Sequence, residues 1–414
     1  MKKWILRLTG LVFIACFLGC PGRPVIIVDI PKRVEQPPTT VPDYSRPLPP
    51  GELALRKITD PAEIPDFTEA CKDLSGLREA ILNSINYLGK PSSQAFFPYG
   101  DISHHHAKTS LTAFLRLIET GYTAEQLDAL IQDQFDVYTS VGYDDRGTVL
   151  FTGYYTPIFE GSTQRTGRFS YPLYRQPDDL MKDQDGNTLG RQTDDGIVPY
   201  PAREEIERSG MLRGNEIMWL ADPFEVYTIQ VQGSAKIRQP DGSLMGVGYA
   251  ANNGHDYQSI ATAMINDGLI PREKMSLTAI IEYFRKHPGD IPRYTNANPR
   301  FIFFHIEDGP PRGSINEPVI RLRSIATDKA IYPRACLSFI STALPGIRGN
   351  EIVHAPYAVF ALDQDAGGAI RAPGRCDLYM GEGDTAGKLA GHTYREGRLY
   401  YLFLKESFVP PEGD

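Results

Sequence analysis

The sequence predicts a mainly β protein with fewer helices, large enough for two domains. Its 414 residues are 41% hydrophobic and 23% charged, which is typical of a globular chain long enough for two cores. The chain contains 38 Gly and 33 Pro, and these counts indicate many turns. From about residue 148 onward, runs of β-branched and aromatic residues are separated by turn residues, which favours strands over a helical bundle.

The N-terminus carries the pattern of a signal peptide over residues 1–19. Lysine and arginine form a positive start, and residues 8–19 form an apolar segment that is too short to span a bilayer, which needs roughly 20 residues. Gly19 directly precedes Cys20, and this resembles the bacterial lipoprotein signal, in which the cysteine is lipidated. A plain secretory signal with an incidental cysteine is the alternative interpretation.

The segment 20–51 is rich in proline, which favours extended conformations and cannot bury a core. We expect it to tether a folded body to a membrane. Besides the anchor, the chain keeps Cys71, Cys336 and Cys376; this odd number implies no disulfide framework, although one pair could form. The net charge of −8 at pH 7 argues against nucleic acid as a partner.

Residues 52–150 are expected to be largely helical. Apolar residues recur at helical spacing over residues 77–88 and again over residues 111–118. Thr123 and Gln126 have the spacing of a capping box at the start of a third helix. Three histidines at 104–106 cannot share one helical face, so we expect a solvated loop there and no metal site.

Later segments read mainly as strands. Residues 149–156 are β-branched and aromatic and are stopped by Pro157, and residues 224–231 alternate with a period of two. A helix is expected around residues 260–264. Further strand candidates are residues 301–304, 358–362 and 399–404.

Three acidic residues near the C-terminus are the candidates for chemistry. Asp377 lies in a short strand-like segment, where a carboxylate is paired, capping or functional. Asp365 precedes two glycines, which alone indicates a turn. Asp328 precedes a Lys-Ala-Ile-Tyr-Pro run that it could cap, so a structural role is favoured for it.

Ordered motifs over residues 149–406 resemble the family of membrane-bound lytic murein transglycosylase A. The matching segments are residues 151–157, 171–175, 201–206, 231–234 and 253–257. Asp328, Asp365 and Asp377 match the three aspartates of the family's C-terminal "3D" region. The resemblance implies a double-psi β-barrel catalytic domain and an inserted second β-rich domain, with a glycan-binding groove between them. Accordingly, residues 52–150 would be the helical part of the barrel domain, 151–300 the insert and 301–408 the catalytic region.

The resemblance also implies the chemistry. Asp377 would protonate the leaving oxygen of the β-1,4 bond between N-acetylmuramic acid and N-acetylglucosamine. It would then deprotonate the C6 hydroxyl, which attacks C1 and leaves a 1,6-anhydro end. This role requires a raised pKa for Asp377 and hence partial burial. A close Arg375 guanidinium would lower this pKa and so oppose the role. Asp365 would be the second carboxylate at the site.

Several polar residues are implied as substrate-binding by the same resemblance, whereas Tyr155 is expected to pack in the core. The substrate-binding set is Thr152, Gly153, Tyr154, Gln232, Ser234 and Asp328. Hydroxyls, amides and aromatic faces suit an N-acetylated sugar. No cofactor or metal is expected.

Two alternatives to a transglycosylase stay open: an inverting glycoside hydrolase with Asp365 as base, and a non-catalytic peptidoglycan-binding lipoprotein. Cys376 as a nucleophile is disfavoured because no histidine is near it in sequence. The expected partners are peptidoglycan glycan strands and a membrane, through the lipid on Cys20, with cell-wall synthesis or division proteins as further candidates. The expected location is the outer membrane, facing the periplasm.

Overall fold

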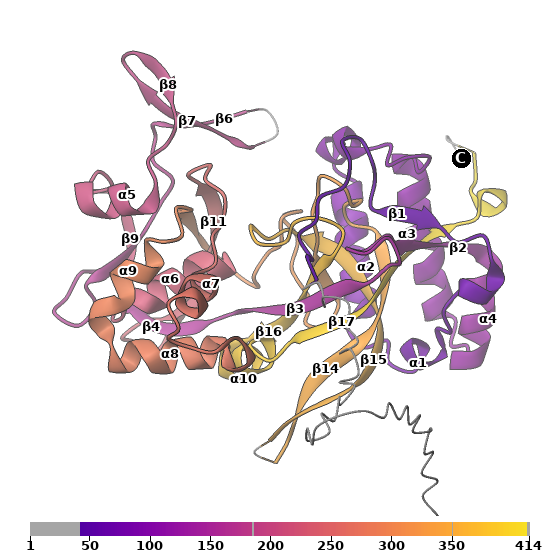
Figure 1. Ribbon diagram of the computed structural model, residues 1–414. Helices are drawn as coiled ribbons and strands as arrows, with labels where there is room; N and C mark the ends of the chain where they lie inside the picture. The colour runs from indigo at the N-terminus through magenta and orange to yellow at the C-terminus, as the bar shows by residue number, and fades with distance from the viewer. Residues whose placement is uncertain (1–41, 184–185, 350, 412–414) are drawn as a thin grey trace, which may run out of the picture. The chain divides into compact units, whose positions relative to one another are not determined.

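The structure is a computed structural model that describes residues 42–183, 186–349 and 351–411 (Figure 1). The predicted signal peptide, the lipidated Cys20 and most of the predicted tether therefore lie outside the described residues. In the described part of the chain, no helix is long and apolar enough to cross a bilayer. The three cysteines Cys71, Cys336 and Cys376 are all buried and free.

The described end of the predicted tether, residues 42–51, packs against the folded body. The Tyr44 hydroxyl donates to a Glu396 carboxylate oxygen at 2.8 Å, and the Tyr44 ring meets Tyr143 edge to face. Leu48 packs against the main hydrophobic core. The expectation of a free spacer therefore does not hold for this end of the segment, because its aromatic and apolar side chains find partners on the body.

A mixed eight-stranded sheet closes into a barrel. The strand order is β1-β2-β17-β14-β15-β13-β16-β3, and an additional β17–β3 pairing closes six of these strands on themselves. The pairs β13–β15 and β16–β3 are parallel, and the other pairs are antiparallel. The strands are β1 (Leu55–Lys57), β2 (Phe135–Ser140), β3 (Val149–Thr156), β13 (Ser324–Ala326), β14 (Leu337–Arg348), β15 (Glu351–Asp365), β16 (Arg375–Glu382) and β17 (Tyr394–Leu404). The predicted mainly β fold with a closed barrel is confirmed.

Four helices cover the barrel on the side of β1 and β2, as Figure 1 shows. They are α1 (Thr68–Cys71), α2 (Leu77–Leu88), α3 (His104–Glu119) and α4 (Ala124–Gln134), and α10 (Gly383–Ala390) packs against β3 and β16. The apolar stripes at residues 77–88 and 111–118 are confirmed as helices. The capping box of Thr123 and Gln126 is also present.

The loop predicted at the three histidines is wrong, because residues 104–106 form the first turn of α3. The Ser103 side chain caps the backbone N–H of His106, a start signal that the histidine run obscured. His106 is buried, and its Nε2 lies 2.6 Å from the carbonyl oxygen of Leu404. This histidine therefore ties α3 to β17.

A second domain lies between β3 and β13 in the sequence. Its six-stranded sheet has the order β12-β11-β10-β4-β9-β5, and a small sheet β6-β7-β8 is separate from it. The strands are β4 (Ile158–Ser162), β5 (Tyr171–Tyr174), β6 (Leu180–Lys182), β7 (Thr188–Thr193), β8 (Gly196–Val198), β9 (Glu216–Leu220), β10 (Ala235–Arg238), β11 (Leu244–Asn252) and β12 (Ile302–Glu307). Sheet membership thus changes at Pro157 and again after Glu307, so β3 belongs to the barrel and β12 to this second sheet.

The helices of this domain are α5 (Arg203–Ser209), α6 (Pro223–Gln232), α7 (Ile260–Asn266), α8 (Leu277–Lys286) and α9 (Ile291–Thr295). The strand predicted at residues 224–231 is wrong, because this segment is helix α6. Asp222 caps the backbone N–H of Phe224, Pro223 occupies the first turn, and Gly233 ends the helix with a φ of 81°. These end signals outweigh the β propensity of the segment.

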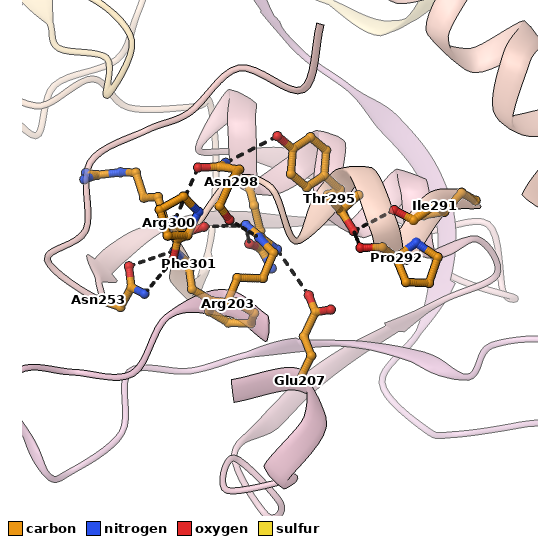
Figure 2. A network of polar contacts seen from close by, with 12 residues as sticks. Arg203, Glu207, Asn253, Ile291, Pro292, Thr295, Asn298, Arg300 and Phe301 are labelled. Carbon is orange, nitrogen blue, oxygen red and sulfur yellow. Dashed lines mark hydrogen bonds and ion pairs between the residues drawn. The ribbon is translucent and has the colours of Figure 1, made fainter. Parts of the chain in front are cut away.

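A buried arginine holds the second domain together (Figure 2). Arg203 is 2% exposed, and its guanidinium donates to Gln230 Oε1 at 2.6 Å and to the carbonyl oxygens of Asn298 and Arg300 at 3.0 and 2.5 Å. An ion pair with Glu207 at 3.3 Å balances its charge. The motif at residues 201–206 is therefore structural at Arg203.

Replacement of Arg203 by Met should lower the free energy of unfolding by about 3 kcal/mol, because three buried acceptors lose their donor. Thermal or urea unfolding of the whole chain measures this loss. Arg208, exposed on the same helix, provides the control, and Arg208→Met should change stability by less than about 0.5 kcal/mol. Equal stability of the two variants would contradict the structural role of Arg203.

Candidate active site

The register of the barrel brings the two candidate carboxylates onto one row. Ala326 of β13 pairs with Asp365 of β15 on one side and with Asp377 of β16 on the other, and Asp377 pairs in turn with Thr152 of β3. Directly paired residues project to the same face of a sheet. The Cα atoms of Asp365 and Asp377 are thus two strand spacings apart, or about 9–10 Å.

Four polar atoms on this face are buried without a hydrogen-bond partner among the described residues. They are Asp377 Oδ1, Thr152 Oγ1, the Tyr154 hydroxyl and Arg375 Nε. Thr152 and Tyr154 are two residues apart on β3, and Arg375 and Asp377 are two apart on β16, so each pair shares a face. Buried polar atoms are rarely unpaired in proteins, so their convergence marks a place prepared for a polar ligand.

Burial sets the protonation of Asp377. Loss of solvent raises the pKa of this carboxyl to about 6 and outweighs the Arg375 cation, which lowers it. The Thr152 hydroxyl is close enough to lower the pKa slightly, and the charge of Asp365 raises it. No ion pair joins Arg375 to Asp377 among the described residues, and the lowering of the pKa by the Arg375 cation is smaller than its raising by burial.

Asp365 is held more firmly than Asp377. Its Oδ1 accepts from the backbone N–H groups of Ser314 at 2.9 Å and Ala366 at 2.8 Å. Burial raises the pKa of Asp365, whereas these two donors, the Tyr154 hydroxyl and the Lys329 cation lower it. The two carboxyls therefore have different environments: Asp365 Oδ1 accepts two backbone hydrogen bonds, whereas Asp377 Oδ1 accepts none from the described residues.

The remaining predicted site residues do not all lie on this face. A Cβ on Gly153 would come within 2.9 Å of Ala390 Cα and of Met380 Cγ, so Gly153 faces the opposite side and allows close packing there. Tyr155 also faces that side, where it is buried against Gly387 of α10, and its predicted packing role is confirmed.

Gln232 and Ser234 join the second domain to β3. Gln232 Oε1 accepts from the backbone N–H of Tyr155 at 3.0 Å, so its amide oxygen has a structural role. The Ser234 hydroxyl lies 3.4 Å from that of Thr156, which in turn lies 2.9 Å from the Tyr379 hydroxyl. Thr156 and Tyr379 were not predicted as site residues from the sequence. Both could have been found, because they lie an even number of residues from Thr152 and Asp377 and so share the face of those residues.

Asp328 has a structural role, as its position before the Lys-Ala-Ile run favoured. Its carboxylate oxygens accept from the backbone N–H groups of Ala330 at 3.1 Å and Ala372 at 3.0 Å. Asp328 also lines a separate cavity of about 500 Å³ beside residues 45–53. A second cavity, of about 740 Å³, lies beside α6, α8 and α10, and Asp377 lines neither of them.

The described residues include no cluster of three or more histidine, cysteine or acidic side chains arranged to hold a metal ion. What the row offers is a carboxyl that keeps its proton near pH 6, a second carboxylate, two hydroxyls and a guanidinium. A carboxyl with a pKa of about 6, such as that of Asp377, can donate a proton to a leaving oxygen and later remove one from an attacking hydroxyl.

Two family profiles match this chain. The MltA specific insert domain matches residues 150–305, and the 3D domain matches residues 323–403. The curated membrane-bound lytic murein transglycosylase A of Escherichia coli (strain K12) is 30% identical over 271 residues, which are 64% of this chain and 69% of that protein. The protein of the same name from Vibrio cholerae is 30% identical over 282 residues, covering 66% of this chain and 71% of its own.

Solved structures have the same fold. The membrane-bound lytic murein transglycosylase from Agrobacterium tumefaciens superposes with a TM-score of 0.71 at 24% identity, covering 86% of this chain and 98% of that one. E. coli MltA with bound chitohexaose superposes with a TM-score of 0.63 at 25% identity, covering 87% and 96%.

Substitution of Asp377 by Asn tests the burial of this carboxyl through stability. In the unfolded chain its pKa is near 3.8 and in the folded chain about 6, so the folded state holds the proton more tightly. The native chain should therefore lose stability as the pH rises from about 4 to 6 and keep that penalty above pH 6. The variant lacks this loss, so we expect it to be more stable than the native chain by about 1–3 kcal/mol at pH 7.5 and equally stable at pH 3.5.

Urea unfolding at both pH values measures this difference. Asp384→Asn provides the control, because Asp384 is exposed on α10. A variant less stable than the native chain at pH 7.5 would contradict the burial of an uncompensated carboxyl.

Proposed function

Because the chain belongs to the family of membrane-bound lytic murein transglycosylase A, we propose that it cleaves peptidoglycan glycan strands by transglycosylation. The observation that carries this proposal is the convergence of unpaired polar atoms around Asp377, a carboxyl whose pKa is raised to about 6. Of the solved relatives, one is described with bound chitohexaose, a chain of N-acetylated sugars. The substrate bond would be the β-1,4 link between N-acetylmuramic acid and N-acetylglucosamine.

The reaction needs one group that first gives and then takes a proton. Protonated Asp377 donates to the glycosidic oxygen as the C1–O bond breaks through an oxocarbenium-like state. The carboxylate then removes the proton of the C6 hydroxyl, whose oxygen bonds to C1 and forms the 1,6-anhydro ring. The proton gained by the leaving sugar equals the proton lost by the hydroxyl, so Asp377 is restored and no water is consumed.

The neighbours of Asp377 fit supporting roles. Asp365, fixed by two backbone donors, would orient the sugar or stabilise the positive charge that develops at C1. Thr152 and Tyr154 offer hydroxyls to the hydroxyl and acetamido groups of the substrate. Ser234 brings the second domain to the same strand, which supports a substrate site with one wall from residues 158–307 and the other from the barrel.

The competing mechanism is an inverting hydrolase that uses Asp365 as general base. This alternative requires the two carboxyl groups to lie about 6.5–9.5 Å apart with a water molecule between them, and the two-strand spacing of their Cα atoms is compatible with it. The backbone donors to Asp365 Oδ1 favour the transglycosylase, because they fix this carboxylate in place and oppose the rise of its pKa that burial causes. The products distinguish the two mechanisms.

Digestion of purified peptidoglycan followed by mass spectrometry of the fragments tests the proposal. Native protein should release fragments with 1,6-anhydro ends, and Asp377→Asn should lower kcat by about 10²–10⁴-fold. Asp328→Asn makes the same change of charge at a structural carboxylate and serves as the control. In folded protein this control should lower kcat by less than about 10-fold. Reducing ends in place of anhydro ends would contradict transglycosylation, and full activity of Asp377→Asn would contradict its role as acid.

Attachment to the cell envelope through lipid on Cys20, with the body in the periplasm at the outer membrane, is part of this proposal. Its support is the signal-like sequence before Cys20 and the membrane-bound description of the curated relatives. Replacement of Cys20 by Ala should release the protein from the membrane fraction. Unchanged membrane association of that variant would contradict the anchor.

A further inference from the structure

One extra residue in β15 separates two neighbouring aspartates onto opposite faces. Ile325 pairs with Asp363, but Ala326, the next residue of β13, pairs with Asp365, so Gln364 is the extra residue of a β-bulge. In a regular strand, residues two apart share a face. Here Asp363 and Asp365 pair with two successive residues of β13, which project to opposite faces. Asp365 therefore turns toward the site and Asp363 toward the core.

The extra residue is fixed in place. Gln364 is fully buried, and its amide donates to the carbonyl oxygen of Ala80 at 2.7 Å and to Ser84 Oγ at 2.9 Å. Its Oε1 accepts from the Ser324 hydroxyl at 2.6 Å. The bulge is therefore anchored both to helix α2 and to β13.

Behind the bulge lies a fully buried ion pair. Asp363 is 0% exposed and pairs with the Lys329 ammonium. The Thr327 hydroxyl and the Tyr401 hydroxyl each donate to Asp363 Oδ2 at 2.7 Å, and Lys329 Nζ donates to Thr327 Oγ1 at 2.9 Å. A buried charge is costly unless it is paired and hydrogen-bonded, and here both conditions are met.

Thr327 connects this pair to the site. Its side chain bonds Asp363, while its backbone N–H donates to the carbonyl oxygen of Asp365 at 3.4 Å. It also directly follows Ala326, the cross-strand neighbour of both Asp365 and Asp377. The pair thus holds the end of the strand that spaces the two site carboxylates.

We propose that Asp363 and Lys329 are positioning residues for the reaction. Held by Thr327 and Tyr401, they fix the bulge and the end of β13 so that Asp365 and Asp377 share one row, and as a neutral pair they add no net charge behind it. This inference rests on the proposed role of Asp377, and neither residue touches the face where substrate would bind.

The charges around Asp365 decide the sign of the test. The groups that act on it from its own and neighbouring elements are Lys329, Tyr154 and Asp377, together with the backbone donors of Ser314 and Ala366, and Asp363 in turn compensates Lys329. The Lys329 cation lowers the pKa of Asp365. When Asp363 is neutral, burial favours the neutral amine of Lys329, so this cation is lost and the pKa of Asp365 should rise.

The experiment compares kcat, KM and the carboxyl titration of Asp365, followed by carbon NMR, in native protein and in Asp363→Asn. We expect kcat to fall about 10–100-fold with KM within about threefold, since misplacement of reacting groups by about 1 Å has such effects. The Asp365 titration should move to higher pH. The double variant Asp363→Asn with Lys329→Gln, which has no amine at this position, should show the same shifted titration.

Tyr401→Phe provides a milder variant that keeps both charges and the fold. It removes one hydrogen bond to Asp363, and we expect kcat to fall about 3–10-fold. Ser110→Ala is its matched control, because Ser110 Oγ bonds Leu404 on the same strand, away from the row. This control should lose stability but keep native kcat and the native Asp365 titration.

The inference would be overturned if folded Asp363→Asn and Tyr401→Phe both kept kcat within twofold and left the Asp365 titration unmoved. It would also be overturned if Ser110→Ala changed kcat and titration as much as Tyr401→Phe. Failure of the proposed function is distinguishable, because Asp377→Asn would then remain active whatever the result for Asp363.

Discussion

The cross-strand row through Ala326 is the constraint on which the site depends. The parallel pairing of β16 with β3 sets Asp377 beside Thr152, and the bulge in β15 turns Asp365 to the same face. These residues come from three distant parts of the sequence. Closure of the barrel by β17 and β3 leaves no free sheet edge at this row, so its spacing cannot relax by fraying.

The same row separates two electrostatic environments. On one face, Asp377 is desolvated without an ion-pair partner, so its proton is retained to about pH 6. On the other face, Asp363 is completely buried and is fully paired with Lys329, Thr327 and Tyr401. Two strand spacings thus separate a carboxyl kept ready to exchange a proton from a carboxylate that serves the fold.

Local sequence patterns predicted the elements whose signals are local. The β-branched and aromatic residues at 149–156 and the capping box at Thr123 gave the correct strand and helix. The segment 224–231 was mistaken for a strand because its alternation was read without the proline and glycine at its ends. The bulge at Gln364 and the burial of Asp363 depend on pairing between strands far apart in sequence, so no local pattern could have indicated them.

The central claim is that burial, helped by the charge of Asp365, raises the pKa of the Asp377 carboxyl to about 6 although Arg375 is two residues away. Carbon NMR of carboxyl groups, with the Asp377 signal assigned by its loss in Asp377→Asn, measures this directly. The account predicts a titration midpoint of about 6, and a midpoint that rises in Arg375→Gln because the opposing cation is removed. A midpoint at or below about 4, the ordinary value for an exposed aspartate, would contradict it.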